Sequence, residues 1–395
     1  MAEVLVPDGV DAGAPWHHGA PLAEQRHLDS DGIVDLARRD VLVITGADRR
    51  RHLHTLSTGD LADLKPGQAA SAFFLDPAGH ILFSFSLVET GTAIWGWTEP
   101  GQGEALAEHI DRLTFRLDVT ATPRPDVALL WKAGPPPGDG EDSAARPADA
   151  GDPVEETTAD GGAGIPDAGI TRTGPDSLGG HEWFIPRQHL AARMTEGFPV
   201  GLWGWEARRI AAGIARVGLD TDARTIPNEL GVPSPAVSLT KGCYPGQEVV
   251  ARVHHLGRPP RRLVRLLFDG SDDAIPQPCT PLLRGEPGGE AVVGRLGSAA
   301  HHARLGLIGL ALVKRDLPDD ALLSLGSKEE SDGAAEQGSA GMVCAIEPLV
   351  AADAGLHFRP DPDLVSPAPR RAGSLSLGMT TAGVAKPGIT IQRGR

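Results

Sequence analysis

Cysteine and aromatic residues are scarce in this chain of 395 residues. Only three cysteines occur, Cys243, Cys279 and Cys344, and no two of them form a C-x-x-C pair. An odd number without that spacing excludes a disulfide framework and a four-cysteine metal site within one chain. We therefore expect a reduced, cytoplasmic protein. Aromatic residues make up 4% of the chain and hydrophobic residues 41%, so its core must be mainly aliphatic.

Long apolar runs are absent as well. The longest, residues 305–313, is about half of a membrane span. Residues 1–13 are acidic and lack the basic region and apolar core of a secretory signal. The formal net charge is −15, whereas non-specific binding to nucleic acid depends on lysine and arginine. We expect no direct contact with membrane or nucleic acid.

Glycine and proline are abundant instead, with 50 and 34 residues, and they gather in particular segments. Residues 134–167 contain nine acidic residues, one basic residue and no aromatic residue, so this stretch supplies −8 of the net charge. Such a segment buries too little apolar surface to offset its ordering entropy. We expect a disordered acidic insert there, a loose leader at residues 1–30, a polar insert at 326–341 and a disordered tail at 359–395.

The segments between these stretches alternate between helical and strand patterns. A helix is expected at residues 48–56, 102–112, 188–196 and 204–215. Strands are expected at residues 41–45, 71–88 (a hairpin around Asp76-Pro77-Ala78-Gly79), 93–97, 115–119, 127–131, 182–186 and 249–254. The mixture lacks strict βαβ alternation, which indicates an α+β fold. Short strands broken by glycine and proline follow in residues 258–358 and predict a small C-terminal β-barrel.

The densest polar chemistry lies in residues 239–263. On an extended backbone Lys241 and Cys243 share one face, and an ammonium beside a thiol favours the thiolate. Gly242 and Gly246 flank the cysteine and permit unusual backbone angles. Alternatively, Cys243 is a small buried hydrophobic residue, as most free cysteines are.

Other charged residues in this part of the sequence leave alternatives open. His254 and His255 could join Cys243 at a metal, but neighbours on a strand point to opposite faces, so we expect no metal. The arginines at 258, 261, 262 and 265 form either a solvated face or an anion clamp. Arg208 and Arg209 either face solvent or project towards a cleft.

The motif K-G-C-Y-x-G-Q-E resembles the signature of the YgfZ family of folate-binding proteins. It comprises Lys241, Gly242, Cys243, Tyr244, Gly246, Gln247 and Glu248. V-A-R-x-H-H-L-G at 250–257, R-I-x-A-G at 209–213, I-P-x-E at 226–229, I-T-G-x-D at 44–48 and the hairpin L-D-P-x-G at 75–79 are similar to the same family. The resemblance spans roughly residues 30–358 without the acidic insert.

This resemblance implies a fold like that of the glycine-cleavage T-protein. Two intertwined α+β domains, residues 31–257, would surround a folate cleft, and a barrel at 258–358 would close one side. It also implies that the protein binds tetrahydrofolate and supports assembly or repair of iron–sulfur client enzymes, including the radical enzymes that modify tRNA. Glu182 would accept two hydrogen bonds from the pterin, and Arg209 would bind the glutamyl tail.

One departure from the T-protein pattern bears on whether the protein is an aminomethyltransferase. T-protein aminomethyltransferases carry a catalytic aspartate shortly after the hairpin glycine, where this chain has Phe83 and Ser84. The sequence therefore favours a folate-binding assembly factor that is not a classical enzyme. Two alternatives stay open, a folate-dependent aminomethyltransferase-like one-carbon transferase and an interaction module with an inert cysteine.

Overall fold

The computed structural model describes residues 3–136, 164–232, 234–285, 287, 291–326 and 341–354. Most of the acidic insert, most of the second polar insert and the whole of the expected tail lie outside these residues. The described elements belong to one unit, residues 1–357. Within them, no helix is long and apolar enough to cross a membrane.

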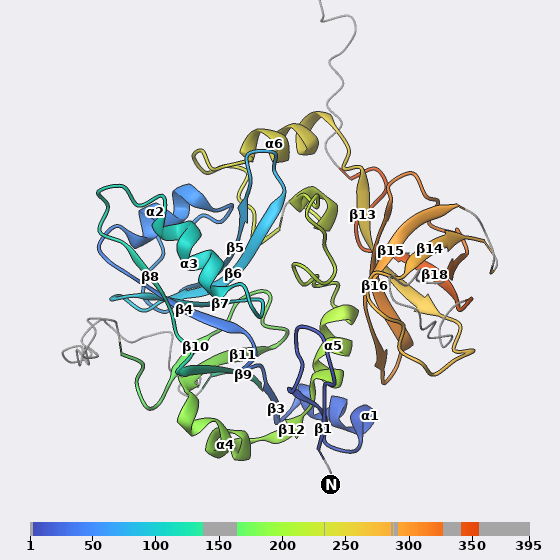
Figure 1. The fold of residues 1–395 in the computed structure, drawn as a ribbon, viewed down its shortest axis with the longest axis horizontal. Helices are drawn as coiled ribbons and strands as arrows, with labels where there is room; N and C mark the ends of the chain where they lie inside the picture. Colours follow the sequence, from blue (N-terminus) through green and yellow to red (C-terminus); the bar gives the residue numbers. More distant parts are fainter. Residues whose placement is uncertain are drawn as a thin grey trace, which may run out of the picture. The chain divides into compact units, whose positions relative to one another are not determined.

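Two five-stranded sheets form the first part of the unit (Figure 1). The first sheet has the order β5-β6-β7-β4-β8, with bounds Ala69–Leu75, Ile81–Glu89, Ile94–Thr98, Asp40–Thr45 and Thr120–Pro123. The second has the order β10-β11-β9-β3-β12, with bounds Ile170–Arg172, Gly180–Pro186, Val127–Ala133, Gly32–Asp35 and Phe198–Val200. The chain first contributes β3 to the second sheet, then forms the whole first sheet, and then returns to complete the second sheet with β9 to β12. The two sheets are therefore intertwined, as expected.

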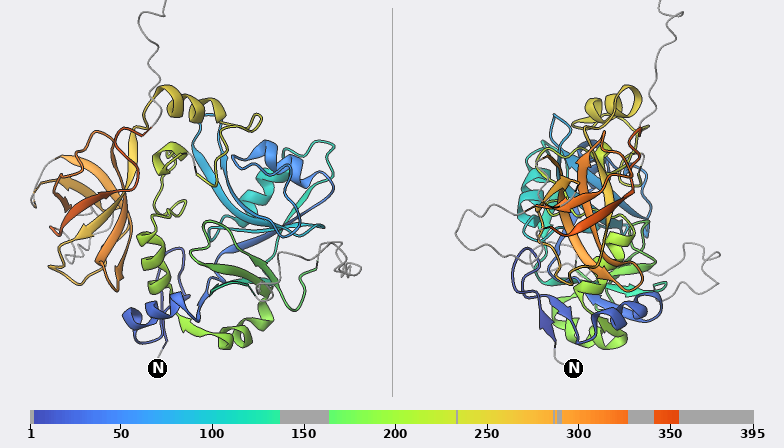
Figure 2. Two further views of the ribbon diagram at one scale, coloured as in Figure 1. Left: turned by 180° about the vertical axis from the view of Figure 1, so that it is seen from behind. Right: turned by 90° about the vertical axis from the view of Figure 1, so that its right-hand side faces the viewer.

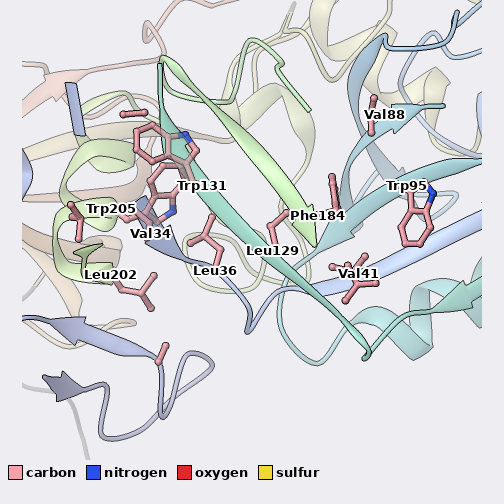
Figure 3. Close-up of a cluster of buried hydrophobic side chains, with 14 of the residues drawn as sticks. Val34, Leu36, Val41, Val88, Trp95, Leu129, Trp131, Phe184, Leu202 and Trp205 are labelled. Atoms are coloured by element: carbon pink, nitrogen blue, oxygen red, sulfur yellow. The ribbon is translucent and has the colours of Figure 1, made fainter. Parts of the chain in front are cut away.

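Helices cover the first sheet on one face, and the second sheet packs near the other. α2 (Arg49–Leu56) and α3 (Gly103–Asp111) bury Leu53, Leu106 and Ile110 against the first sheet. The core shared by both sheets contains Val41 and Val88 from the first and Leu129 and Phe184 from the second. Figure 3 shows these side chains in a row that continues to Trp131 and Trp205. The core is largely aliphatic and includes Trp95, Trp131 and Trp205.

The second part of the unit is a closed barrel with strand order β13-β16-β15-β14-β17-β18. The strands are Arg261–Phe268, Gly306–Lys314, Val292–His302, Pro281–Arg284, Leu323–Leu325 and Val343–Pro348. They appear in yellow, orange and red in Figure 2. The long helix α5 (Leu202–Ala211) packs Ala207 and Ile210 against barrel residues Leu263 and Ile308. The expected α+β fold with a C-terminal barrel is confirmed.

Among the remaining helices, one is as long as α5 and corrects a sequence expectation. The remaining helices are α1 (Pro21–Glu24), α4 (Leu190–Arg193), α6 (Gln247–Leu256), η1 (Gln25–Asp29), η3 (Arg187–His189), η4 (Met194–Glu196) and η5 (Pro227–Leu230). Residues 249–254, expected as a strand, lie in α6. Val249, Val250 and Val253 fit a helical spacing as well as a strand, and Gly246 at φ 76° turns the chain into the helix.

Two further expectations differ from the structure. The strand expected at residues 115–119 does not form, because Phe115 and Arg116 have positive φ, and β8 begins at Thr120. Residues 3–30, expected as a loose leader, contain β1 (Val4–Leu5), β2 (Pro15–His17), α1 and η1. This segment is held by burial of Leu28 and by Glu24, whose carboxylate accepts the backbone N–H of Gly201 at 3.0 Å.

Candidate functional site

A cavity of about 290 Å³ opens between the two sheets, α5 and the segment that follows it. Phe73 and Trp97 of the first sheet and Trp205 of α5 supply apolar walls. Polar residues line the rest, among them carboxylates and arginines from segments far apart in the sequence. The cavity can therefore hold a flat, partly polar organic molecule.

Glu182, which the family resemblance assigns to a folate cleft, lies on the cavity wall and is almost fully buried. It sits on β11 directly opposite Arg172 of β10. Arg172 Nη1 donates to Glu182 Oε2 at 2.8 Å, and the Ser177 hydroxyl donates to the same oxygen at 2.7 Å. Burial raises the pKa of Glu182, and Arg172 opposes that shift. Within the described part of the chain, Oε1 has no hydrogen-bond partner, so it is open to a ligand donor.

Asp176 is a second cavity carboxylate, and sequence reasoning missed it. It accepts hydrogen bonds from Ser71 Oγ at 2.7 Å, Ser86 Oγ at 3.0 Å and Arg172 Nη2 at 2.6 Å. Burial raises its pKa, but Arg172 and the hydroxyls more than offset this, so the pKa lies below its usual range. The cavity therefore does contain a carboxylate beside β6, which corrects the inference from Phe83 and Ser84. Ser71 and Ser86 pair across β5 and β6, but nothing local in the sequence links them to Asp176.

Arg209 also lies on the cavity wall, but its donors bind protein groups. It donates to Glu206 Oε2 through Nε at 2.8 Å and also through Nη2. Nη1 donates to Asp220 Oδ2 at 2.8 Å and to the Ile214 carbonyl at 3.1 Å. Burial raises the pKa of Glu206, but Arg209 and Arg216 lower it to about 2 overall. Arg209 therefore stabilises the cavity wall through hydrogen bonds within the protein.

Two other donors on the wall are better placed for a ligand. Arg39 is buried and pairs with Asp11 and Glu99 through Nη1, at 3.1 and 3.2 Å. Its Nε and the Trp97 indole Nε1 have no hydrogen-bond partner among the described residues. Buried polar groups rarely stay unpaired without a reason. Both residues line the cavity, so an acceptor on a bound molecule would complete their hydrogen bonding.

The motif at residues 241–248 forms a loop and the start of α6 rather than a strand. Lys241 Nζ donates to the carbonyls of His54, Ser57 at 2.6 Å and Gly59 at 2.7 Å. An ammonium has three donors, so Lys241 caps the end of α2 and has none left for Cys243. Burial lowers the pKa of Lys241 to about 8. The expected Lys241–Cys243 pairing fails because the backbone is not extended here.

The other motif residues hold this loop against the β5–β6 hairpin. Tyr244 is buried, with a pKa raised by burial to about 12. A Cβ on Gly246 would lie 2.8 Å from the Cα of Gly79, so this close approach requires glycine. Gln247 Nε2 donates to the Lys241 carbonyl at 3.3 Å. Glu248 is exposed at the start of α6 and Gly242 is exposed in the loop.

Cys243 is exposed and lines an open depression with Pro77 and Gln247. None of the residues lining this depression lines the cavity. The buried-hydrophobe alternative for Cys243 is therefore excluded, and the thiol and the cavity are separate features.

Three of the four arginines in the basic run after α6 are ion-paired, which neither open alternative foresaw. Arg261 pairs with Asp222 and Glu229, Arg262 with Asp319, and Arg265 with Glu347. His254 and His255 contact each other edge to face, with ring centroids 4.9 Å apart. In the described part of the chain, no group of three or more histidine, cysteine or acidic side chains could hold a metal ion.

Comparison with known proteins identifies the fold of this chain. No family model matches the chain. An aminomethyltransferase of Bordetella avium (strain 197N) is 28% identical over 230 residues, which cover 55% of this chain and 62% of that protein. The crystal structure of glycine cleavage system aminomethyltransferase T from Bartonella henselae superimposes with a TM-score of 0.64 at 18% identity, covering 87% of this chain and 92% of that one. The chain has the T-protein fold.

The T-protein fold accounts for the arrangement of the two sheets, α5 and the barrel. It does not by itself assign an activity, because one fold supports many functions. The aminomethyltransferase alignment spans less than two thirds of that relative's length. Function must therefore be argued from the cavity and the exposed thiol.

The Lys241 cap predicts a structural role for that residue. Lys241→Ala leaves three carbonyls at the end of α2 without their donor, so we expect the free energy of unfolding to fall by about 1–3 kcal/mol. Lys65→Ala, at an exposed lysine, is the matched control. Urea unfolding measures both, and the alkylation rate of Cys243 should stay unchanged. Slower alkylation with unchanged stability would mean that the ammonium serves the thiol.

The Glu206 pairs predict acid sensitivity. The pKa of Glu206 in the folded protein, about 2, lies below its ordinary value of 4.5, so ionised Glu206 stabilises the folded state above pH 4.5. That stabilisation is lost as the pH falls towards 2. We expect Glu206→Gln to be less stable than the parent at pH 7, with the difference narrowing between pH 4.5 and 2. Parallel stability curves over this range, measured by urea unfolding, would contradict the assignment.

Proposed function

We propose that the chain binds tetrahydrofolate or a derivative in the cavity between its sheets. The observation that carries the proposal is Glu182, a buried carboxylate with one free oxygen on the wall of an aromatic-lined cavity. A pterin ring is flat and presents an amide N–H and an amino group side by side, which a carboxylate can accept. The similarity to an aminomethyltransferase and the T-protein fold support the same ligand class.

The remaining wall residues suit the other parts of such a ligand. Phe73, Trp97 and Trp205 supply surfaces for the rings. The unpaired Nε of Arg39 suits an acidic tail better than Arg209 does, because the Arg209 donors are bonded within the protein. The groups present therefore fit a folate.

Our proposal for the biological role is an accessory factor in assembly or repair of iron–sulfur enzymes, among them radical enzymes that modify tRNA. It rests on the resemblance of residues 241–248 to the YgfZ signature and on the exposure of Cys243. A cytoplasmic location belongs to the same proposal. The thiol would act at its own depression and not in the cavity, since the two share no lining residue.

An aminomethyltransferase-like one-carbon transfer is the second candidate. Asp176 favours it, because its carboxylate lies in the cavity beside Ser86 with its pKa held low. An ionised carboxylate there would stabilise positive charge that develops on a bound one-carbon unit. The chain would then act as an enzyme.

The folate proposal predicts the behaviour of one substitution. Glu182→Gln replaces the anionic acceptor by a neutral amide, so tetrahydrofolate should bind about tenfold more weakly at pH 7.5. The pKa of Glu182 is raised, so its carboxylate takes up a proton at a higher pH than an exposed glutamate does. The affinity of the parent for tetrahydrofolate should therefore already fall in that higher pH range. The affinity of the variant should not change with pH there. Calorimetry checks both.

Glu108→Gln, at an exposed glutamate of α3 outside the cavity, is the matched control and should bind like the parent. Unchanged affinity in Glu182→Gln would remove Glu182 from the contact. Absence of tetrahydrofolate binding by the parent would refute the folate proposal itself.

The two roles predict different outcomes for the exposed thiol. In a strain that lacks the gene, Cys243→Ala should fold and bind folate but fail to restore iron–sulfur enzyme activities. Cys279→Ala, at another exposed cysteine, should restore them. Full restoration by Cys243→Ala would exclude a thiol mechanism. Formation of methylenetetrahydrofolate from an aminomethyl donor by purified protein, lost in Asp176→Asn, would establish one-carbon transfer instead.

A further inference from the structure

A second, polar pocket of about 210 Å³ lies where η1 and α5 meet the turn between β15 and β16. Its lining includes Arg26, Asp29, Arg208, His302 and Arg304. Three of these side chains carry a positive charge and one a negative charge, so with neutral His302 the pocket has a net charge of about +2. This is notable in a chain whose net charge is −15. None of these residues lines the cavity between the sheets.

The walls of this pocket are fixed by hydrogen bonds. The amide of Gln25, a buried residue, donates to the His301 carbonyl and accepts the backbone N–H of Ala303, both at 2.8 Å. It thereby holds the β15–β16 turn against η1. Arg208 Nη1 donates to Asp29 at 2.7 Å, and Nε donates to the Leu178 carbonyl at 2.9 Å. The turn and the Arg208 side chain are therefore held in place without a ligand.

Several donors in the pocket have no protein acceptor. Within the residues that the structure describes, the guanidinium groups of Arg26 and Arg304 make no hydrogen bond or ion pair. Nη2 of Arg208 is likewise unbonded there. His302 Nδ1 accepts the backbone N–H groups of Arg304 and Leu305, both at 3.2 Å, which places the proton of the neutral ring on Nε2. Burial and the charges of Arg304, Arg265 and Arg208 lower the pKa of His302.

We infer that this pocket binds the phosphate group of a phosphorylated small molecule. Arg26 and Arg304 offer forked donors, which match phosphate oxygens in pairs, and Arg208 adds the N–H groups of its free Nη2. A net charge of +2 balances a phosphate dianion, whereas a single carboxylate would leave a positive charge uncompensated. The inference does not depend on the folate proposal, because the two sites share no lining residue.

The test is calorimetry on the full chain in a chloride buffer of constant ionic strength. The probes are inorganic phosphate, inorganic pyrophosphate and malonate. We expect phosphate and pyrophosphate to bind and malonate to bind at least about tenfold more weakly. Arg304→Ala and Arg26→Ala should each weaken pyrophosphate binding about tenfold or more, since each removes a charged hydrogen bond. Both arginines are exposed, so the variants should fold.

Arg284→Ala is the matched control, because it removes the same charge from an exposed position on the barrel strand β14. It should leave pyrophosphate binding within about twofold of the parent. Absence of pyrophosphate binding, or equal weakening in Arg284→Ala and Arg304→Ala, would overturn the site. Malonate binding as tight as phosphate binding would overturn the phosphate assignment. Unchanged tetrahydrofolate binding in Arg304→Ala would show that the cavity stays intact in that variant.

Discussion

Arg216 connects three segments that lie far apart in the sequence. Its guanidinium pairs with Asp11 of the N-terminal hairpin, Glu99 after β7 and Glu206 of α5, at 2.6, 2.9 and 3.0 Å. Glu206 in turn pairs with Arg209, and Arg209 with Asp220. Removing one partner of a buried ion pair typically costs about 3–5 kcal/mol, because an uncompensated charge stays buried. The walls of the cavity therefore depend on this network as a set.

The same network reaches the barrel. Asp220 Oδ1 accepts the backbone N–H of Ser298 at 2.8 Å and its hydroxyl at 2.6 Å, and Ser298 lies on β15. The barrel is thus bonded to the segment that lines the cavity, in addition to its apolar contact with α5. This arrangement explains why a chain with a small aromatic content can maintain a charged cavity: arginines and carboxylates neutralise one another around it, and the aliphatic core lies behind them.

The sequence predicted the architecture better than the site. The apolar runs of β4 to β7 and the turn at Asp76–Gly79 are local signals, so these strands were recognisable. The helix α6 was not, since its valines fit both periods and Gly246 alone marks the change. The pairing of Lys241 with α2 carbonyls and the approach of Asp176 to Ser71 and Ser86 join segments far apart in the chain. No pattern along one segment can reveal such contacts. Glu182 was found through resemblance, and the structure gave its partners.

The interleaving of the two sheets has a consequence for synthesis of the chain. β3 is made early, yet Val34 pairs with Trp131 of β9 and with Val200 of β12. The second sheet therefore cannot close until the whole first sheet has left the ribosome. Such long-range pairing slows folding, because the chain loses conformational entropy in closing the loop before the stabilising contacts form. The barrel, by contrast, comes from one contiguous stretch made afterwards. An unpaired β3 edge on the nascent chain is thus the point at which aggregation or chaperone binding competes with folding.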